Sequence, residues 1–223
     1  MNIGTIRASI LCAALLIFQD PGAARAAEAT AFDTELHDIV LAWDHANFDK
    51  QDSDARRAAL EQVTQRAKAF AEQYPQRSEA LIWEGIALSS YAGAKGGLGA
   101  LSIAKKSREC LQSALKLNPA ALNGSAYTSL GVLYYKVPGF PLGFGDHDKA
   151  RDYLQKALQL NPDGIDPNYF FGELMYEEGE YREALRYLNK AEAASPRSER
   201  PIADRGRREE IAALMDKTQA KLR

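Results

Sequence analysis

The stretch GELMYEEGEYREALRYLNKAEAASP, residues 172–196, decides the fold of this 223-residue chain. It places two small residues, Gly172 and Ala184, where the two helices of a pair would cross closely. Tyr181 and Leu188 recur on one face of the second helix at a spacing of seven. Pro196 ends the pattern, because proline cannot continue a helix. The stretch therefore predicts a pair of short helices followed by a stop.

The same ending recurs along the chain. The segments AFAEQYP, SALKLNP, KALQLNP and KAEAASP end at Pro75, Pro119, Pro162 and Pro196, with spacings of 44, 43 and 34 residues. The two middle units keep the small residue of the first helix as Gly85 and Gly131, whereas Ser107 replaces the alanine of the second helix in the earlier unit. Compared with the 34-residue unit, they carry insertions of ten and seven residues between their helices.

This 34-residue pattern resembles the tetratricopeptide repeat. The matching marker positions of the last unit are Gly172, Gly179, Tyr181, Ala184, Leu188, Ala191 and Pro196. The resemblance implies an all-α fold, a right-handed superhelical solenoid of helix pairs. A C-terminal capping helix is expected because the end of a solenoid needs a polar outer face. Clear motifs cover residues 79–198, and degenerate ones cover residues 32–75.

The pattern divides the chain into four expected segments. They are a signal peptide (1–26), a degenerate N-terminal helix pair (27–75), three repeats with insertions (76–198) and a capping helix (199–223). Helices are predicted over residues 32–48, 55–73 and 204–222, the last with Asp204 as its N-cap and with Ile211, Leu214 and Met215 near one face. We interpret Arg205, Arg207 and Arg208 as a solvated face of that last helix.

Both insertions are expected to form loops between the two helices of a unit. One is the Gly-rich run AGAKGGLGALS, residues 92–102, which includes Leu98 and Leu101. The other lies in KVPGFPLGFGDHDKA, residues 136–150, where Pro138 predicts a helix end near Lys136 and Asp146 is placed to cap the next helix.

The second loop is unusual because it carries three large apolar side chains, Phe140, Leu142 and Phe144. Either they seal the protein's own surface, or they form the lid or contact surface of a binding site. We expect the first, because a cluster of exposed apolar side chains promotes aggregation.

The resemblance also implies a binding groove lined by the first helices of the units. The residues that it assigns to a partner or ligand are Ile82, Ile86, Thr128, Val132, Tyr135, Tyr169, Glu173 and Tyr176, with Phe140, Leu142 and Phe144 beside them. The Lys, Asn and Arg clamp with which chaperone-binding members hold a peptide carboxylate is absent. The predicted groove is apolar and tyrosine-rich with acid at one end, a composition common at interfaces. Alternatively, Ile82, Ile86 and Val132 are simply covered by the N-terminal helices.

The N-terminus predicts export. An apolar run of eleven residues, Ala8–Phe18, precedes the helix breaker Pro21-Gly22 and the small-residue site Ala24-Arg25-Ala26. The expected mature product is periplasmic, without a membrane-inserted segment. It would keep one cysteine, Cys110, which is expected to be a half-buried helical residue. The formal net charge of −2 argues against nucleic-acid binding.

No pattern in the chain predicts catalysis, a metal site or a cofactor. His37 and His45 are eight residues apart, so they do not face one another on a helix. The sequence Asp146-His147-Asp148 is better explained as a helix start than as a metal site, because adjacent residues there do not converge on one point. Zinc-protease, nucleophile-elbow and phosphate-loop motifs are absent.

Two functions remain. The first is a periplasmic scaffold that binds a protein or peptide partner in the groove. The second is an accessory protein that binds a small apolar ligand, because the order of insertions before D-x-x-A-R-x-x-x-x-A-L resembles the T component of tripartite solute-uptake transporters.

Overall fold

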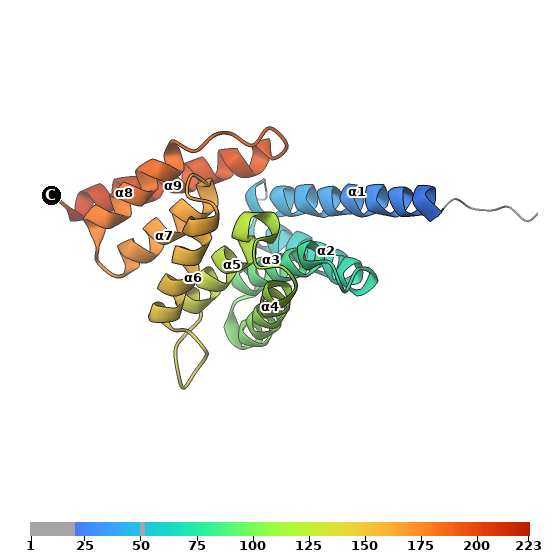
Figure 1. Cartoon of the computed structure of the whole chain (residues 1–223). Helices are drawn as coiled ribbons and strands as arrows, with labels where there is room; N and C mark the ends of the chain where they lie inside the picture. Colours follow the sequence, from blue (N-terminus) through green and yellow to red (C-terminus); the bar gives the residue numbers. More distant parts are fainter. Residues whose placement is uncertain (1–20, 50–51) are drawn as a thin grey trace, which may run out of the picture. The chain divides into compact units, whose positions relative to one another are not determined.

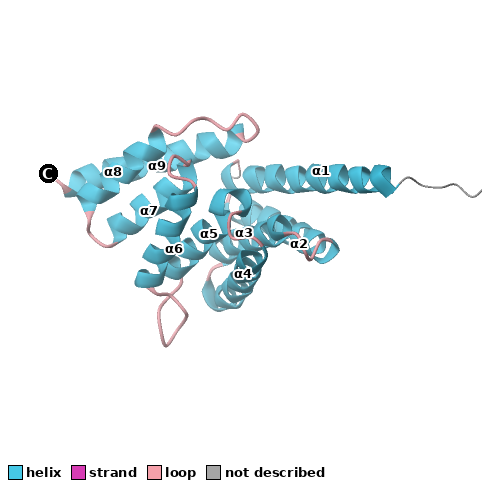
Figure 2. Ribbon diagram, viewed as in Figure 1, coloured by secondary structure: helices cyan, strands magenta, loops and turns pink. Residues whose placement is uncertain are grey.

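The computed structural model of the chain describes residues 21–49 and 52–223 (Figure 1). These residues form nine α-helices, one short 3-10 helix and no β-strand (Figure 2). The helices are α1 (Pro21–Phe48), α2 (Ser53–Gln73), α3 (Ser78–Lys95), α4 (Gly97–Leu117), η1 (Ala121–Gly124), α5 (Ser125–Lys136), α6 (His147–Leu160), α7 (Ile165–Glu177), α8 (Tyr181–Glu192) and α9 (Pro201–Lys221). The predicted all-α class is confirmed.

The chain divides into two compact units, residues 1–34 and 35–223. In the first unit, the described residues 21–34 belong to the first part of α1. The apolar run 8–18 of the predicted signal peptide lies outside the described residues. Within the described part of the chain, no helix is both long enough and apolar enough to cross a membrane.

Two helices include residues ahead of their predicted starts. Helix α1 already contains Pro21 and Gly22, ahead of the predicted start at Phe32, so the pair expected to break a helix lies within one. Helix α9 begins at Pro201 rather than Asp204. Proline suits the first helical turn, where its missing N–H would have no partner within the helix. Asp204 therefore lies inside α9 rather than capping it, and it accepts a hydrogen bond from the backbone N–H of Arg197 (2.6 Å).

The helices of the second unit pack as successive pairs, α3 with α4, α5 with α6, and α7 with α8 (Figure 1). Their crossings confirm the repeat register. A Cβ atom built on Gly85, Gly131 or Gly172 would lie 2.6, 2.5 or 3.0 Å from the nearest atom of the leucine on the partner helix. Those leucines are Leu111, Leu154 and Leu188, at equivalent positions of the three units. The close approach of the helices therefore leaves no room for a Cβ at Gly85 and Gly131, and little room at Gly172.

The serine that breaks the pattern in the first of these units is accommodated by a hydrogen bond. The hydroxyl of Ser107 donates to the backbone carbonyl of Gly85 across the same crossing (2.6 Å). Both residues are buried, so the bond satisfies a hydroxyl that would otherwise be costly to bury.

The Gly-rich insertion does not form the loop that was predicted. Residues 92–102 instead extend the end of α3 and the start of α4, and the turn between the helices is a single residue, Gly96. Gly96 has φ 61° and ψ −175°, a conformation open essentially to glycine alone. The insertion therefore lengthens both helices of the pair. The prediction of a loop over residues 92–102 is wrong.

Helix α9 caps the last repeat, as predicted. It packs on α8 and α7. Its side chains Ile211 and Leu214 are buried in an apolar cluster with Leu188 and Ala191 of α8, and Met215 packs against that cluster.

Candidate functional site

The first helices of the pairs form the inner face of the solenoid. Helix α3 contacts α5, α5 contacts α7, and α7 contacts α9. Over the part of the chain that the structure describes, the backbones of the second helices α4, α6 and α8 do not approach one another. Helices that touch their successors lie on the side of smaller radius, so α3, α5 and α7 line the concave side and α4, α6 and α8 the convex side.

The predicted groove residues differ in depth along these helices. Ile82, Thr128 and Tyr169, which hold the fifth position of their units, are all buried. One turn further along, the ninth position is half-buried in all three units. Its residues are Ile86, Val132 and Glu173. Tyr135 is buried and Tyr176 is half-buried. The inner helices are therefore closed at the fifth position, and they are partly accessible at the ninth position and at Tyr176. We call these two parts the closed half and the accessible half of the inner face.

A compact polar group occupies the accessible half. The hydroxyl of Tyr135 donates to the carboxylate of Glu173 (2.5 Å). The ammonium group of Lys136 lies 3.0 Å from Glu173 and 2.7 Å from Glu177. Burial and the Glu173 carboxylate raise the pKa of Tyr135 well above its usual value. Burial would lower the pKa of Lys136, but the two carboxylates outweigh it and raise that pKa. The carboxylates of Glu173 and Glu177 share the ammonium group of Lys136. The polar cluster as a whole therefore keeps a net negative charge.

An ion-pair cluster joins the N-terminal end of α7 to the start of α9. Asp166 of α7 pairs with Arg197 (2.7 Å) and with Arg207 (2.9 Å). Burial would raise the pKa of Asp166, but these guanidinium groups hold it well below its usual range. The Arg207 side chain is 8% exposed and lies over the rings of Tyr169 and Phe170. The interpretation of Arg207 as part of a solvated face is wrong, because α9 turns this side chain toward α7.

The other two arginines of the predicted solvated face, Arg205 and Arg208, differ from Arg207 in exposure and in their partners. The Arg205 side chain is 60% exposed. The guanidinium group of Arg208 donates to the backbone carbonyl of Ala194 (2.7 Å).

The same cluster joins α9 to the C-terminal part of α1. Arg200 donates two hydrogen bonds to the carboxylate of Asp44 (2.5 and 3.1 Å), a side chain that is fully buried. Arg200 also lies over the rings of Trp43 and Trp83. Sequence reasoning missed Asp44 and Arg200. The one sequence feature that could have indicated this contact is that both tryptophans of the chain, Trp43 and Trp83, take part in it.

The three apolar side chains of the loop after α5 differ in burial. One of them packs on the protein's own surface, and the other two are exposed. Phe144 is half-buried, 5.6 Å from the ring of Tyr134 and beneath the guanidinium group of Arg108 (4.2 Å). Phe140 is 94% exposed and Leu142 is 74% exposed. The expectation that all three side chains seal the protein's own surface is therefore wrong for Phe140 and Leu142.

Backbone hydrogen bonds explain how the loop exposes them. The N–H groups of Gly143 and Gly145 donate to Gly139 and Pro138 (3.0 and 2.9 Å), which folds the segment back on itself. The loop extends away from the helices (Figure 1), which leaves Phe140 and Leu142 exposed.

The residues considered for chemistry have structural roles. The carboxylate of Asp146 caps α6 by accepting from the N–H of Lys149 (3.0 Å), as predicted. Cys110 is half-buried in α4, and burial together with Glu84 raises the pKa of its thiol to about 12. Among the described residues, no three His, Cys, Asp or Glu side chains are grouped to hold a metal ion.

Residues 142–203 match a family model described as Tetratricopeptide repeat. Among solved structures, TTC0263, a thermophilic TPR protein in Thermus thermophilus, is 19% identical to this chain. It aligns with a TM-score of 0.55 over 74% of this chain and 82% of that one. Two crystal structures of MamA are 19% and 20% identical, cover 77% and 84% of this chain and 95% and 92% of theirs, and give TM-scores of 0.44 and 0.41. No curated protein matches the sequence.

The family match and the TTC0263 structure show that the fold is a solenoid of tetratricopeptide-type helix pairs. At this level of identity the likeness to TTC0263 concerns the fold alone. The comparisons give no support to the resemblance to a solute-transport component.

Proposed function

We propose that this protein is a non-catalytic scaffold that binds a segment of a partner protein along the accessible half of its inner face. The observation that carries the proposal is the row of half-buried side chains Ile86, Val132 and Tyr176 on three successive inner helices. Such a row offers apolar surface over a long path, which suits an extended or helical segment better than a compact ligand.

The polar group beside this row indicates the chemistry of the partner segment. Glu173 and Glu177 share the ammonium group of Lys136, which leaves negative charge unbalanced. A segment that carries apolar side chains next to a lysine or arginine would complement both features. Tyrosine is enriched at the centres of interfaces, so Tyr176 is the residue on which binding should depend most.

A pull-down with matched tyrosine variants tests the proposal. The bait is the chain from Ala27 onward, immobilised and exposed to periplasmic extract. We expect Tyr176→Ala to lose about tenfold or more of the captured partner, as removal of a central aromatic side chain does. Tyr187, half-buried on the outer helix α8, provides the control. Equal capture by parent and Tyr176→Ala, with unchanged thermal midpoints, would contradict the proposal.

We also propose that the scaffold is exported and works in the periplasm. This rests on the apolar run Ala8–Phe18 and the small-residue site before Ala27. Mass spectrometry of periplasmic and membrane fractions should find a product that starts near Ala27 in the periplasm. A membrane-bound product that retains residues 1–26 would overturn the proposal.

A further inference from the structure

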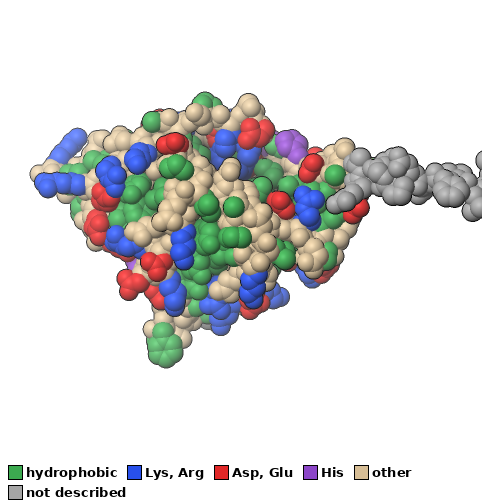
Figure 3. Space-filling model, viewed as in Figure 1, with side chains coloured by type: hydrophobic (Ala, Val, Ile, Leu, Met, Phe, Trp, Pro, Cys, Tyr) green, Lys and Arg blue, Asp and Glu red, His purple; other side chains and the backbone are tan. Residues whose placement is uncertain are grey.

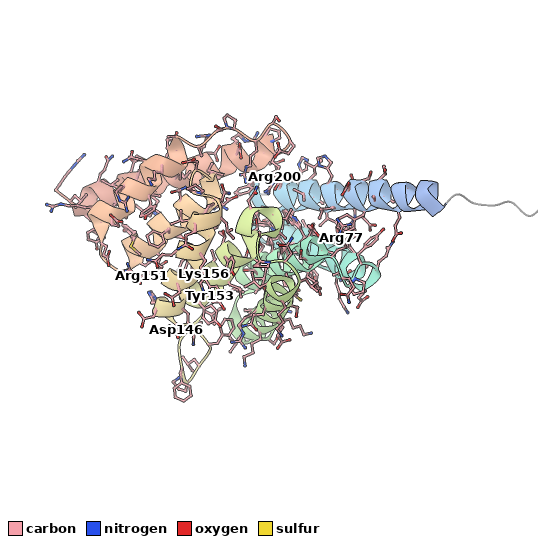
Figure 4. All side chains as sticks on the ribbon, in the orientation of Figure 1. Arg77, Asp146, Arg151, Tyr153, Lys156 and Arg200 are labelled. Atoms are coloured by element: carbon pink, nitrogen blue, oxygen red, sulfur yellow. The ribbon has the colours of Figure 1, made fainter. Side chains whose placement is uncertain are left out.

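A second surface lies on the convex side, between α4 and α6. The backbones of these two helices do not approach each other, and α5 packs against both. A side-chain hydrogen bond joins Gln112 of α4 to Tyr153 of α6. We call the surface between α4 and α6, with α5 beneath it, the groove. In Figure 3 this face shows a strip of apolar side chains bordered by lysine and arginine side chains. Figure 4 shows Tyr153 and Lys156 on the α6 side of the same face.

The floor of the groove is aromatic. Tyr134 of α5 stacks on Tyr153 of α6 with ring centroids 5.5 Å apart and an angle of 15°. Tyr127 of α5 lies 6.1 Å from Tyr153. Tyr134 is buried, whereas Tyr127 and Tyr153 are half-buried and so present part of their rings to the groove. Leu117 and Leu160, the last residues of α4 and α6, are exposed as well.

The walls of the groove are cationic. The ammonium group of Lys156 lies 5.8 Å from the ring centre of Tyr153 and 5.9 Å from that of Tyr127. On the facing helix, Arg108 is held over Phe144. Lys105 and Lys116 of the same helix are exposed. Cation–π contact keeps Arg108 and Lys156 at the groove instead of letting them extend into solvent.

These cations lack acidic partners. Lys149 pairs with Asp146 (2.9 Å), but no described carboxylate lies within ion-pairing distance of Arg108, Lys156, Lys105 or Lys116. The Nε atom of Arg108 is buried and has no hydrogen-bond acceptor among the described residues. The arginines at the start of α9, in contrast, all have carboxylate partners. Unmatched positive charge beside apolar surface is therefore a property of this groove.

We propose that the groove between α4 and α6 binds an acidic segment of a protein, with carboxylates against Arg108 and Lys156 and an apolar side chain on the tyrosine floor. A nucleic acid fits less well. Tyr134 and Tyr153 stack on one another, so these faces are not free for bases, and the whole chain has a net charge of −2. The proposal is independent of the function assigned to the inner face.

Fluorescence anisotropy with a defined probe tests this. The probe is a labelled twelve-residue peptide that repeats Asp-Glu-Phe-Glu. We expect saturable binding to the parent that weakens with added salt. Lys156→Glu should weaken binding by about tenfold or more, because like charges would face each other across the contact. Lys156→Gln, which only removes the charge, should weaken it less.

The repeat provides the matched control. Lys190 lies 34 residues after Lys156 and sits over Tyr187 at 5.4 Å, as Lys156 sits over Tyr153. Lys190→Glu should leave the affinity within about twofold of the parent. Tyr176→Ala should leave it unchanged too, which separates this surface from the inner face.

Three results would overturn the proposal. They are no saturable binding of the acidic peptide, equal losses for Lys156→Glu and Lys190→Glu, or stronger binding of single-stranded oligothymidylate or of anionic vesicles than of the peptide. Thermal midpoints within error of the parent would show that each variant is folded.

Discussion

At the scale of single residues, the fold depends on how closely helices cross at three glycines. The missing side chain of each leaves room for a leucine of the partner helix. The room differs among them: a Cβ atom would lie 2.5 Å from Leu154 at Gly131, but 3.0 Å from Leu188 at Gly172. A contact below 3 Å forces the backbone or the leucine to move, whereas one at 3.0 Å asks for a small adjustment.

The three glycine-to-alanine variants should therefore differ in a fixed order. Gly131→Ala and Gly85→Ala should each cost about 2–3 kcal/mol of unfolding free energy, and Gly172→Ala about 1 kcal/mol. Urea denaturation of the chain from Ala27 onward measures all three. A Gly172→Ala variant that is as unstable as Gly131→Ala would show that these distances do not decide the cost.

Residues with a repeating pattern could be predicted from the sequence, and residues without one could not. The crossing glycines and their leucines recur in each unit, so local spacing identified them. Asp44 and Arg200 are 156 residues apart and belong to no repeat. Arg207 was misassigned because its neighbours are charged, and a local charge pattern does not distinguish a solvated arginine from a paired, buried one.

At the scale of elements, the two insertions have opposite outcomes. Glycine costs about 1 kcal/mol in a helix relative to alanine, so the Gly-rich run at residues 92–102 predicted a loop. Packing of α3 against α4 overrides that cost and extends both helices. The insertion after α5 contains Pro138, which forces the helix to end, and it is a true loop. A sequence pattern reports only the local preference of each residue for a helix or a loop. It does not report the tertiary packing energy, which here exceeds that preference.

Two neighbouring glycines in the first insertion should respond in opposite directions to alanine. Gly93 lies within α3 with nothing within 4 Å of a Cβ, so Gly93→Ala should stabilise by about 0.5–1 kcal/mol. Gly96 has a φ of 61° at the turn, so Gly96→Ala should destabilise by about 1–3 kcal/mol. Thermal or urea unfolding of both variants checks the prediction. Stabilisation by both would mean that α3 and α4 are not separated at Gly96.

The loop after α5 predicts another contrast. Phe144 packs on Tyr134, so Phe144→Ser should cost about 1–2 kcal/mol, less than the ~1.5–3 kcal/mol of a fully buried side chain. Phe140 is exposed, so Phe140→Ser should change stability by less than about 0.5 kcal/mol. If guanidinium denaturation shows a large loss for Phe140→Ser, the tip of the loop packs on the protein after all.

At the scale of the whole molecule, the start of α9 ties together parts that are distant in sequence. Arg200 reaches Asp44 of α1, while Arg197 and Arg207 reach Asp166 of α7. With them, Arg207 covers Tyr169 of α7 and Arg200 covers Trp83 of α3. The sequence could predict which residues face inward, because the repeat sets their positions. It could not predict their depth, because depth depends on contacts with residues distant in sequence, such as Arg207 over Tyr169.

The role of Asp166 in these ion pairs predicts a pH dependence. The pKa of Asp166 is lower in the folded chain than its ordinary value of 3.8. The unfolded chain therefore binds more protons near that pH, and the stability that this carboxylate confers rises with pH. This stabilisation by the Asp166 carboxylate is complete above the pKa of Asp166 in the unfolded chain. It is lost as the pH falls toward the pKa of Asp166 in the folded chain.

Asp166→Asn should consequently cost more at neutral than at acid pH. We expect a loss of about 2–3 kcal/mol at neutral pH, below the ~3–5 kcal/mol for fully buried pairs because Asp166 is partly exposed. The difference from the parent should shrink below about pH 4. The exposed neighbour Asp163 provides the control, and Asp163→Asn should show neither effect. A deficit for Asp166→Asn that is the same at both pH values would contradict the ion-pair account.

The central claim is that the accessible half of the inner face holds a partner protein. Site-specific photo-crosslinking in living cells tests it most directly, with p-benzoyl-phenylalanine in place of Tyr176 in one strain and of Tyr187 in the other. Both residues are half-buried tyrosines of the same repeat, on the inner helix α7 and the outer helix α8. The account predicts a discrete covalent product with another protein from position 176 and none from position 187. A discrete product from position 187 alone, or none from either position, would contradict it.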